Sequence, residues 1–514
     1  MPNDGSTAET QNAIPSPLTP QNLMVEDPSV ARELLPPTAN ALTLADVIAS
    51  IYQSYPMITR ARLEAGVVAG EQRSANGWWD PKLETYSVNQ PLGFYKNYRQ
   101  SVGLARNLWW GGYLSSGYRI GRGDFEPWYK ERQTDLGGEF KLAWVQPLLQ
   151  GYSIDPNRVS LFQANLRQQA VTPLVQREIL DNGVEGANAY WKWVSAGQVV
   201  RTQEELLRLA QVRMGQIQKQ VDLGEVKASI LIFNSQLIAE REFKLLETVR
   251  KLREASFKLS LYLRDADGQP MVPDDMWLPS TFPPLGPVPP GDFSADMAAA
   301  LERRPELQLL DLDSRQSQLD LQLARNQTLP QFDLVLENSQ DVGAPASSLR
   351  DKSPFESELG FQGSVPLPRN KARGKIQSTQ NKLSQIAQYR ELQSNKIGVE
   401  LQTARNALEI AAERVNQAEK TVRIAIQYLE LTERGFNEGE GDLLDLNILE
   451  SKTYDSRFYL IDATQEWFAA LAAMQRALGL DPLEQAIRLN ESASAIEAPL
   501  VIPESIAPRG QFSR

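Results

Sequence analysis

Residues 401–430 read LQTARNALEIAAERVNQAEKTVRIAIQYLE. Within this stretch, apolar or small residues recur at alternating intervals of three and four: Leu401, Ala404, Leu408, Ala411, Val415, Ala418, Val422, Ala425 and Leu429. Such an unbroken heptad seam is typical of helices that supercoil around one another. We expect one helix from about Gly374 to Arg434, roughly 90 Å long at 1.5 Å per residue. A helix of that length needs neighbours along its apolar face, so the seam predicts coiled-coil packing.

The same seam recurs in other parts of the chain. It is interrupted by a glycine-rich turn and resumes over 446–477, again at spacings of three and four. A less regular version runs over 180–194 toward Gly224, and another over 245–263. Many seam positions are Ala or Ser, which allow close helix approach. The pattern therefore favours a packed cylinder wall over a thick globular core.

Two halves of the chain resemble each other. Pro56 and Pro305 are 249 residues apart, and so are Pro81 and Pro330. After the second proline of each pair the pattern becomes that of β-strands. We therefore expect an internal repeat in which each half contains a helix, a β hairpin, a long helix, a tight turn and a second long helix.

The first half is expected to contain one additional hairpin. From Pro81 to Pro147 is 66 residues, whereas the matching distance from Pro330 to Pro366 is 36. The extra residues include Arg99–Arg122, where aromatic and apolar residues alternate on both sides of Trp109-Trp110-Gly111-Gly112. This is the pattern of two strands joined by a short turn.

Proline clusters and the repeat set the expected boundaries. They divide the chain into an extended or disordered N-terminal arm, a first repeat, a proline-rich linker, a second repeat and an irregular C-terminal tail, over residues 1–40, 41–267, 268–291, 292–480 and 481–514.

Composition excludes several classes of function. The 514 residues contain no histidine and no cysteine, so a Ser-His-Asp or Cys-His catalytic site, a zinc site with imidazole or thiolate ligands and a disulfide are all impossible. The net charge of −11 disfavours nucleic acid as a partner. No P-loop and no apolar run long enough for a transmembrane helix occur. We expect no enzymatic activity, no cofactor and no metal site.

From about residue 41 to 480 this order of elements resembles the TolC-like bacterial outer-membrane efflux channel family. The resemblance depends on the duplication, the paired prolines, the strand ends Gln146-Pro147-Leu148 and Val365-Pro366-Leu367, and Leu449-Glu450-Ser451 after the glycine-rich turn.

The resemblance implies a fold that is mainly α with a β portion. Three protomers would each contribute four transmembrane β-strands to one shared β-barrel in the outer membrane, and the duplicated heptad helices would continue it as a periplasmic tunnel. The resemblance also implies a passive exit duct for efflux or type I secretion, working with a periplasmic adaptor protein and an inner-membrane transporter. A signal peptide would precede residue 1. Ten Trp, Tyr and Phe residues in the first β region fit aromatic belts at a lipid interface.

Acidic residues after the glycine-rich turn are the candidates for a gate. In the family, acids there form rings that narrow the tunnel, and Glu450 matches one of them. Asn447 stands where a second acid is usual, so Asp442 or Asp445 is a possible substitute. Threefold symmetry would turn each carboxylate into a ring that attracts cations. The alternative is that Asp442 caps the helix and Asp445 interacts with its dipole.

The two helix-to-helix turns are expected to form the tunnel tip and the adaptor-docking surface, through Gly224, Glu225, Gly439 and Gly441. Glycine permits the sharp reversal that such turns need. The simpler interpretation, plain αα-hairpin turns, is compatible with the same residues.

Two other classes of protein fit parts of the pattern. One is a soluble coiled-coil scaffold with accessory β-hairpins. The other is a hydrolase that uses only carboxylates, which would need a deep pocket with convergent acids in one protomer. The cargo of a duct, whether drug, metal, peptide or protein, is not specified by these residues.

Overall fold

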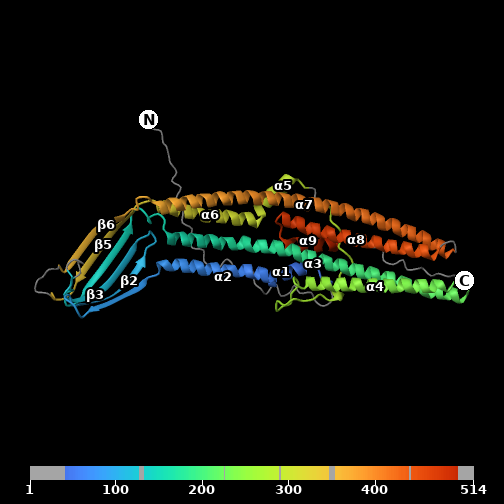
Figure 1. The fold of residues 1–514 in the computed structure, drawn as a ribbon, viewed down its shortest axis with the longest axis horizontal. Helices are drawn as coiled ribbons and strands as arrows, with labels where there is room; N and C mark the ends of the chain where they lie inside the picture. The colour runs from blue at the N-terminus through green and yellow to red at the C-terminus, as the bar shows by residue number, and fades with distance from the viewer. Residues whose placement is uncertain are drawn as a thin grey trace, which may run out of the picture.

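The computed structural model describes residues 41–495, except 127–131, 225, 289–290, 347–352 and 439–441. The molecule is elongated, with a β-sheet at one end and long helices that run from the sheet to the opposite end (Figure 1). The expected class, mainly helical with a β portion, is confirmed.

The first repeat starts with two helices separated by a proline. Thr43 caps the first helix in a capping box with Asp46, and Pro56 occupies the first turn of the second. The elements of this repeat are α1 (Leu44–Ser54), α2 (Pro56–Asn76), the 3₁₀ helix η3 (Gly77–Trp79), β1 (Lys82–Gln90), β2 (Asn97–Asn107), β3 (Tyr113–Gly123), β4 (Glu139–Pro147), α3 (Pro156–Asp222) and α4 (Ser229–Leu259).

The second repeat has the same order with one hairpin fewer. Pro305 begins its second helix, as Pro56 does in the first repeat. Its elements are α5 (Phe293–Arg303), α6 (Pro305–Asn326), β5 (Gln331–Asp341), β6 (Phe355–Ser364), α7 (Asn370–Asn437) and α8 (Leu443–Ala477). The helix expected from Gly374 to Arg434 is therefore confirmed and extends a few residues further at each end.

The segments outside the repeats differ in structure. In the linker, the described residues include a short 3₁₀ helix, η5 (Asp275–Trp277), and Pro270 forms an isolated β-bridge with Arg264. The C-terminal tail is not irregular throughout, because α9 spans Pro482–Ala495. Asp481 accepts hydrogen bonds from the backbone N–H groups of Leu483 and Glu484 at 2.9 and 3.1 Å, which stabilises the start of this helix. The N-terminal arm and residues 496–514 lie outside the described residues.

The six strands of the described residues form one antiparallel sheet in the order β1 to β6. The additional hairpin is present as β2 and β3, at the position expected from the spacing of the prolines. The number of strands corrects the expectation of four per protomer, because both strands of this hairpin pair along their whole length within the sheet rather than folding away from it.

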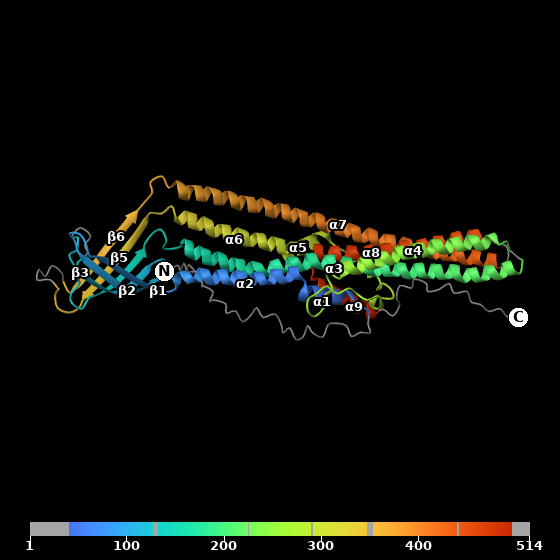
Figure 2. The same ribbon diagram turned by 60° about the horizontal axis from the view of Figure 1, so that its bottom comes forward.

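The heptad seams form the helical core. Leu401, Leu408, Val415 and Leu429 are all buried against neighbouring helices. Near the middle of the molecule the ring of Trp191 in α3 stacks on that of Phe468 in α8, with centroids 3.9 Å apart. Close to the sheet, α2, α3, α6 and α7 lie side by side in that order and form a single row (Figure 2).

Candidate functional site

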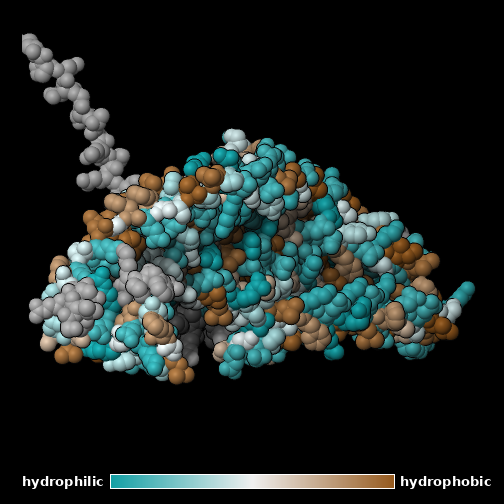
Figure 3. Space-filling view, turned by 60° about the vertical axis from the view of Figure 1, so that its left-hand side comes forward, coloured by the Kyte–Doolittle hydropathy of each residue, from teal (hydrophilic) through white to brown (hydrophobic). Residues whose placement is uncertain are grey.

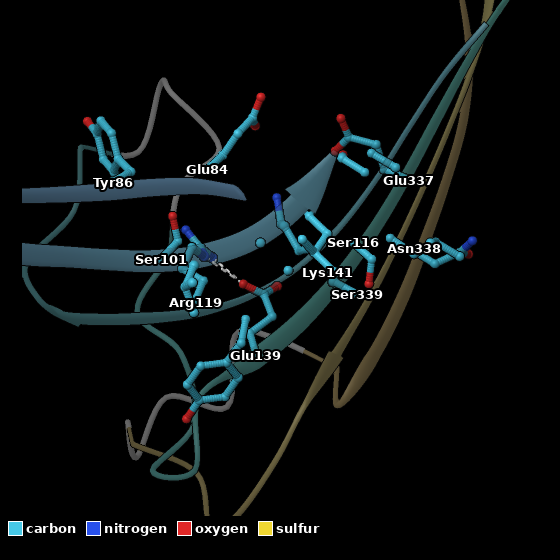
Figure 4. A pocket seen from close by; sticks show the side chains of 18 of the residues that line it. Glu84, Tyr86, Ser101, Ser116, Arg119, Glu139, Lys141, Glu337, Asn338 and Ser339 are labelled. Carbon is cyan, nitrogen blue, oxygen red and sulfur yellow. Dashed lines mark hydrogen bonds and ion pairs between the residues drawn. The ribbon is translucent and has the colours of Figure 1, made fainter. Parts of the chain in front are cut away.

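The sheet has two chemically different faces, because side chains alternate along each strand. On one side of the sheet, which we call the inner face, the side chains of Arg119, Glu139 and Lys141 point into a cavity of about 1070 Å³ (Figure 4). The register places one row of residues on this face: Glu84, Gly103, Gly117, Lys141, Ser339 and Glu356. The neighbouring row lies on the opposite side, which we call the outer face: Leu83, Leu104, Ser116, Leu142, Asn338 and Ser357.

Polar and charged side chains dominate the inner face. Arg119 of β3 donates to Glu139 of β4 at 2.7 Å, and the Glu139 side chain is almost fully buried in this pair. Figure 4 shows the pair in the cavity together with Lys141 and Glu337. Glu337 and Glu358 stand directly opposite each other on β5 and β6. Neighbouring like charges on a sheet repel each other, and water screens that repulsion. This face is therefore suited to contact with water.

The outer face exposes many large apolar side chains. In the space-filling view, brown patches mark apolar residues beside the polar surface (Figure 3). Leu83, Leu104 and Leu359 are 60–70 % exposed. Further exposed apolar residues on this face include Tyr98, Val102, Leu114, Phe140, Leu142, Phe332, Phe355 and Phe361. This number of exposed large apolar side chains on one face marks an interface with another protein or with lipid.

The two helix-to-helix turns lie at the end of the molecule farthest from the sheet (Figure 1). Between α3 and α4, Gly224 has a φ of +77°, a conformation that glycine adopts without steric cost. It is exposed, and an added Cβ would meet nothing within 4 Å. Its neighbour Glu225 and both Gly439 and Gly441 lie outside the described residues.

Asp442 and Asp445 are exposed at the start of α8. Asp442 caps this helix, since its Oδ1 accepts from the backbone N–H of Leu444 at 3.1 Å. Asp445 lies in the first turn. Capping by Asp442 is therefore confirmed, and the exposure of both carboxylates leaves them available to a solvent-filled space.

Glu450 occupies a different environment from the other two acids. Its side chain has no exposed surface and pairs with two arginines from other helices. Arg213 of α3 contacts Oε1, and Arg241 of α4 approaches Oε2 to 3.3 Å. This carboxylate therefore faces α3 and α4, unlike the exposed carboxylates of Asp442 and Asp445.

Further polar contacts surround this three-residue ion cluster of Arg213, Arg241 and Glu450. Arg213 donates to Asn447 Oδ1 at 3.0 Å, and Arg241 donates to the carbonyl of Leu206 at 2.7 Å. Burial lowers the pKa of Arg241, while the neighbouring Glu450 opposes that shift. The cluster joins α3, α4 and α8 at one level close to the tip.

Sequence reasoning missed Arg213 and Arg241, although a signal for Arg213 was present. Arg213 continues the series Leu206, Ala210 and Ile217 at intervals of four and three, and all four side chains are buried. A charged residue at a seam position must find a partner, because an unpaired buried charge is costly. That requirement indicates an ion pair between helices.

Two features are absent from the described part of the chain. No helix there is both long enough and apolar enough to cross a membrane. No group of three or more acidic side chains in those residues could hold a metal ion.

The chain is similar to a known protein family and to several solved structures. Residues 297–480 match the family model described as outer membrane efflux protein. This confirms the resemblance to TolC-like outer-membrane efflux channels. No curated protein sequence matches the chain.

Solved structures share the fold over most of the chain. The open state of the Neisseria gonorrhoeae MtrE outer membrane channel aligns with a TM-score of 0.60 at 15% identity, covering 87% of this chain and 94% of its own. The Vibrio cholerae outer membrane protein VceC gives 0.59 at 15%, covering 85% and 96%. The Campylobacter jejuni CmeC outer membrane channel gives 0.59 at 11%, covering 88% and 90%.

Proposed function

We propose that this protein is the outer-membrane exit duct of a tripartite efflux or type I secretion system. The observation that carries the proposal is the two-faced sheet attached to a row of long helices. An apolar outer face fits lipid, and a polar inner face fits a water-filled passage. The matches to outer membrane channels support the same assignment.

The open sheet edges make oligomerisation necessary for this function. Unpaired backbone N–H and C=O groups at β1 and β6 would be costly in lipid, so the sheet must close through further copies. We propose a homotrimer in which the sheets form one β-barrel in the bacterial outer membrane and the helices form a periplasmic tunnel. The apolar outer face argues against the soluble scaffold, because that face would be left in water.

The tip is proposed to meet the rest of the export system. The turns around Gly224 and Glu225, and around Gly439 and Gly441, would dock a periplasmic adaptor protein connected to an inner-membrane transporter. Conduction would be passive, with energy supplied by the transporter. Asp442 and Asp445, which are exposed, would line the entrance as two rings of three carboxylates that favour cations.

Conductance in planar lipid bilayers tests the proposal. Trimers are expected to form cation-selective pores, and a variant with Asp442→Asn and Asp445→Asn is expected to be less selective. Asparagine is also a good helix cap, so α8 should keep its start. Asp267→Asn, an exposed acid in the turn that follows α4, is the control and should leave selectivity unchanged. Folded trimer without pore activity, or a stable monomer in detergent-free buffer, would contradict the proposal.

A further inference from the structure

The hairpin of β2 and β3 has no counterpart in the second repeat. Between the helices α2 and α3 the first repeat has four strands, whereas between α6 and α7 the second has two. β2 pairs with β1 over nine residue pairs and with β3 over eleven. The hairpin is thus fully integrated in the middle of the sheet, and it separates β1 from β4.

The hairpin has the same two faces as the rest of the sheet. Val102, Leu104 and Leu114 are exposed on the outer face, while Ser101 and Ser115 alternate with them along the strands and lie on the inner face. A hairpin folded into the lumen as a plug would be wetted on both sides and would not need this alternation. The alternation indicates that the hairpin is part of the wall.

Two facing glycines bring the strands of the hairpin close together. Gly103 and Gly117 are directly opposite on the inner face. An added Cβ at Gly103 would lie 2.8 Å from the carbonyl oxygen of Ser116, and one at Gly117 would lie 3.0 Å from that of Val102. Glycine at both positions allows the sheet to curve toward its inner face here, as a wall bent into a barrel must.

We propose that three copies close an 18-stranded barrel, six strands from each copy, by pairing β6 of one protomer with β1 of the next. The inference assumes the exit duct proposed above. An even number of strands per copy makes β6 and the neighbouring β1 antiparallel, which continues the pattern inside the sheet. The occupant of each open edge is therefore a second copy of this chain.

The row of helices gives an independent measure of how wide the sheet of one protomer must be. Four helices in a row, spaced by about 8–10 Å, cover roughly 32–40 Å of circumference. Six strands about 4.8 Å apart and tilted by about 40° cover roughly 38 Å, whereas four would cover roughly 25 Å. The hairpin thus brings the width of the sheet to that of the row formed by α2, α3, α6 and α7.

A wider barrel changes what can leave the duct. Barrel diameter grows about linearly with strand number, so 18 strands give about 1.5 times the diameter of the 12 strands expected at four per protomer. Barrels of about 16–18 strands leave an aqueous channel. The exit would accept bulky hydrophilic cargo, and selection by size would occur at the helical tip.

Site-directed thiol labelling tests the position of the hairpin, since every introduced cysteine is unique in this chain. Ser115→Cys reports the inner face of β3 and Leu104→Cys the outer face of β2. Ala143→Cys and Leu142→Cys on β4 are the matched pair on a strand outside the hairpin. In one experiment, full-length trimer in lipid vesicles would be treated with a charged methanethiosulfonate. In a second, separate experiment, each cysteine would carry a fluorophore and the vesicles would contain brominated lipid.

In both pairs, the cysteine on the inner face is expected to react faster with the charged methanethiosulfonate than the cysteine on the outer face. The fluorophore on the outer face is expected to be quenched by brominated lipid more strongly than the one on the inner face. The ratio of inner to outer reactivity should be the same for the hairpin pair and the β4 pair. Equal aqueous reactivity at Leu104→Cys and Ser115→Cys, with a normal β4 pair, would place the hairpin in the lumen. That result would overturn the inference and leave the exit duct intact. Loss of the difference in both pairs, with no pores, would overturn both.

Cross-linking tests the number of copies. Ser87→Cys on β1 combined with Ser357→Cys on β6, both on the outer face, is expected to give covalent trimers on oxidation, and native mass spectrometry should find three copies. Each single cysteine variant is the control and should remain monomeric on a denaturing gel. Covalent dimers as the largest product, with two copies by mass, would mean a 12-stranded barrel and would refute the proposal.

Discussion

Replacement of Glu450 by glutamine is expected to loosen the contact among α3, α4 and α8. The carboxylate is the counter-charge of Arg213 and Arg241, whose side chains are only 8% and 3% exposed. Glutamine keeps the size of the side chain but leaves both guanidinium groups without that charge. Removing one partner from a buried ion pair costs about 3–5 kcal/mol.

Hydrogen–deuterium exchange of the folded trimer would measure this loss locally. Every 1.4 kcal/mol is a factor of ten, so amides around Arg213, Arg241 and Glu450 should exchange about a hundredfold to a few thousandfold faster if they open locally. Amides of the sheet should keep their rates, since the cluster lies at the opposite end of the molecule (Figure 1).

Two further variants make the interpretation specific. Glu247→Gln breaks an exposed pair with Lys251 at 2.8 Å and should leave exchange unchanged. A triple variant, Arg213→Met with Arg241→Met and Glu450→Leu, should recover most of the lost protection, because an apolar replacement of a whole buried cluster is often neutral or stabilising. Exchange of Glu450→Gln at the wild-type rate would refute the reasoning.

Three shorter predictions concern other positions. Burial raises the pKa of Glu433 above its ordinary value of 4.5, so its folded form favours the proton and stability falls as pH rises through the shifted pKa. Glu433→Gln should therefore raise the melting temperature at pH 7 and lose this advantage below pH 4.5, as scanning calorimetry at the two pH values would show. Asp442→Ala should weaken the start of α8 by about 0.5–2 kcal/mol while Asp442→Ser does not, measured as exchange of the first amides of α8. Gly117→Ala should lower the heat resistance of the trimer on a gel, because its Cβ meets the Val102 carbonyl at 3.0 Å, whereas Gly360→Ala, with open space, should not.

The spacing of apolar residues alone predicted the longest helix of the second repeat. The seam from Leu401 to Leu429 predicted α7 and most of its buried face, because a heptad pattern specifies both the helix and the side that packs. The equal spacing of Pro56 and Pro305 predicted the duplication, and in the structure these prolines begin α2 and α6, since proline fits the first turn of a helix.

Properties that depend on neighbours were harder to predict. The number of strands was wrong because the resemblance supplied four, although the extra hairpin had been recognised from the distance between Pro81 and Pro147. The burial of Glu450 could not be seen in α8 alone, since it depends on Arg213 and Arg241, which are more than 200 residues away in the sequence. The predicted roles of Asp442 and Asp445 at a tunnel entrance stay predictions.

The unequal share of strands between the repeats has a consequence for symmetry. Each repeat contributes the same set of long helices, so in the proposed trimer the helical wall would be close to sixfold symmetric. The sheet cannot be, because one repeat contributes four strands and the other two. Cargo moving outward would pass from nearly sixfold surroundings to strictly threefold ones, and charged positions such as Arg119 would recur every 120° rather than every 60°.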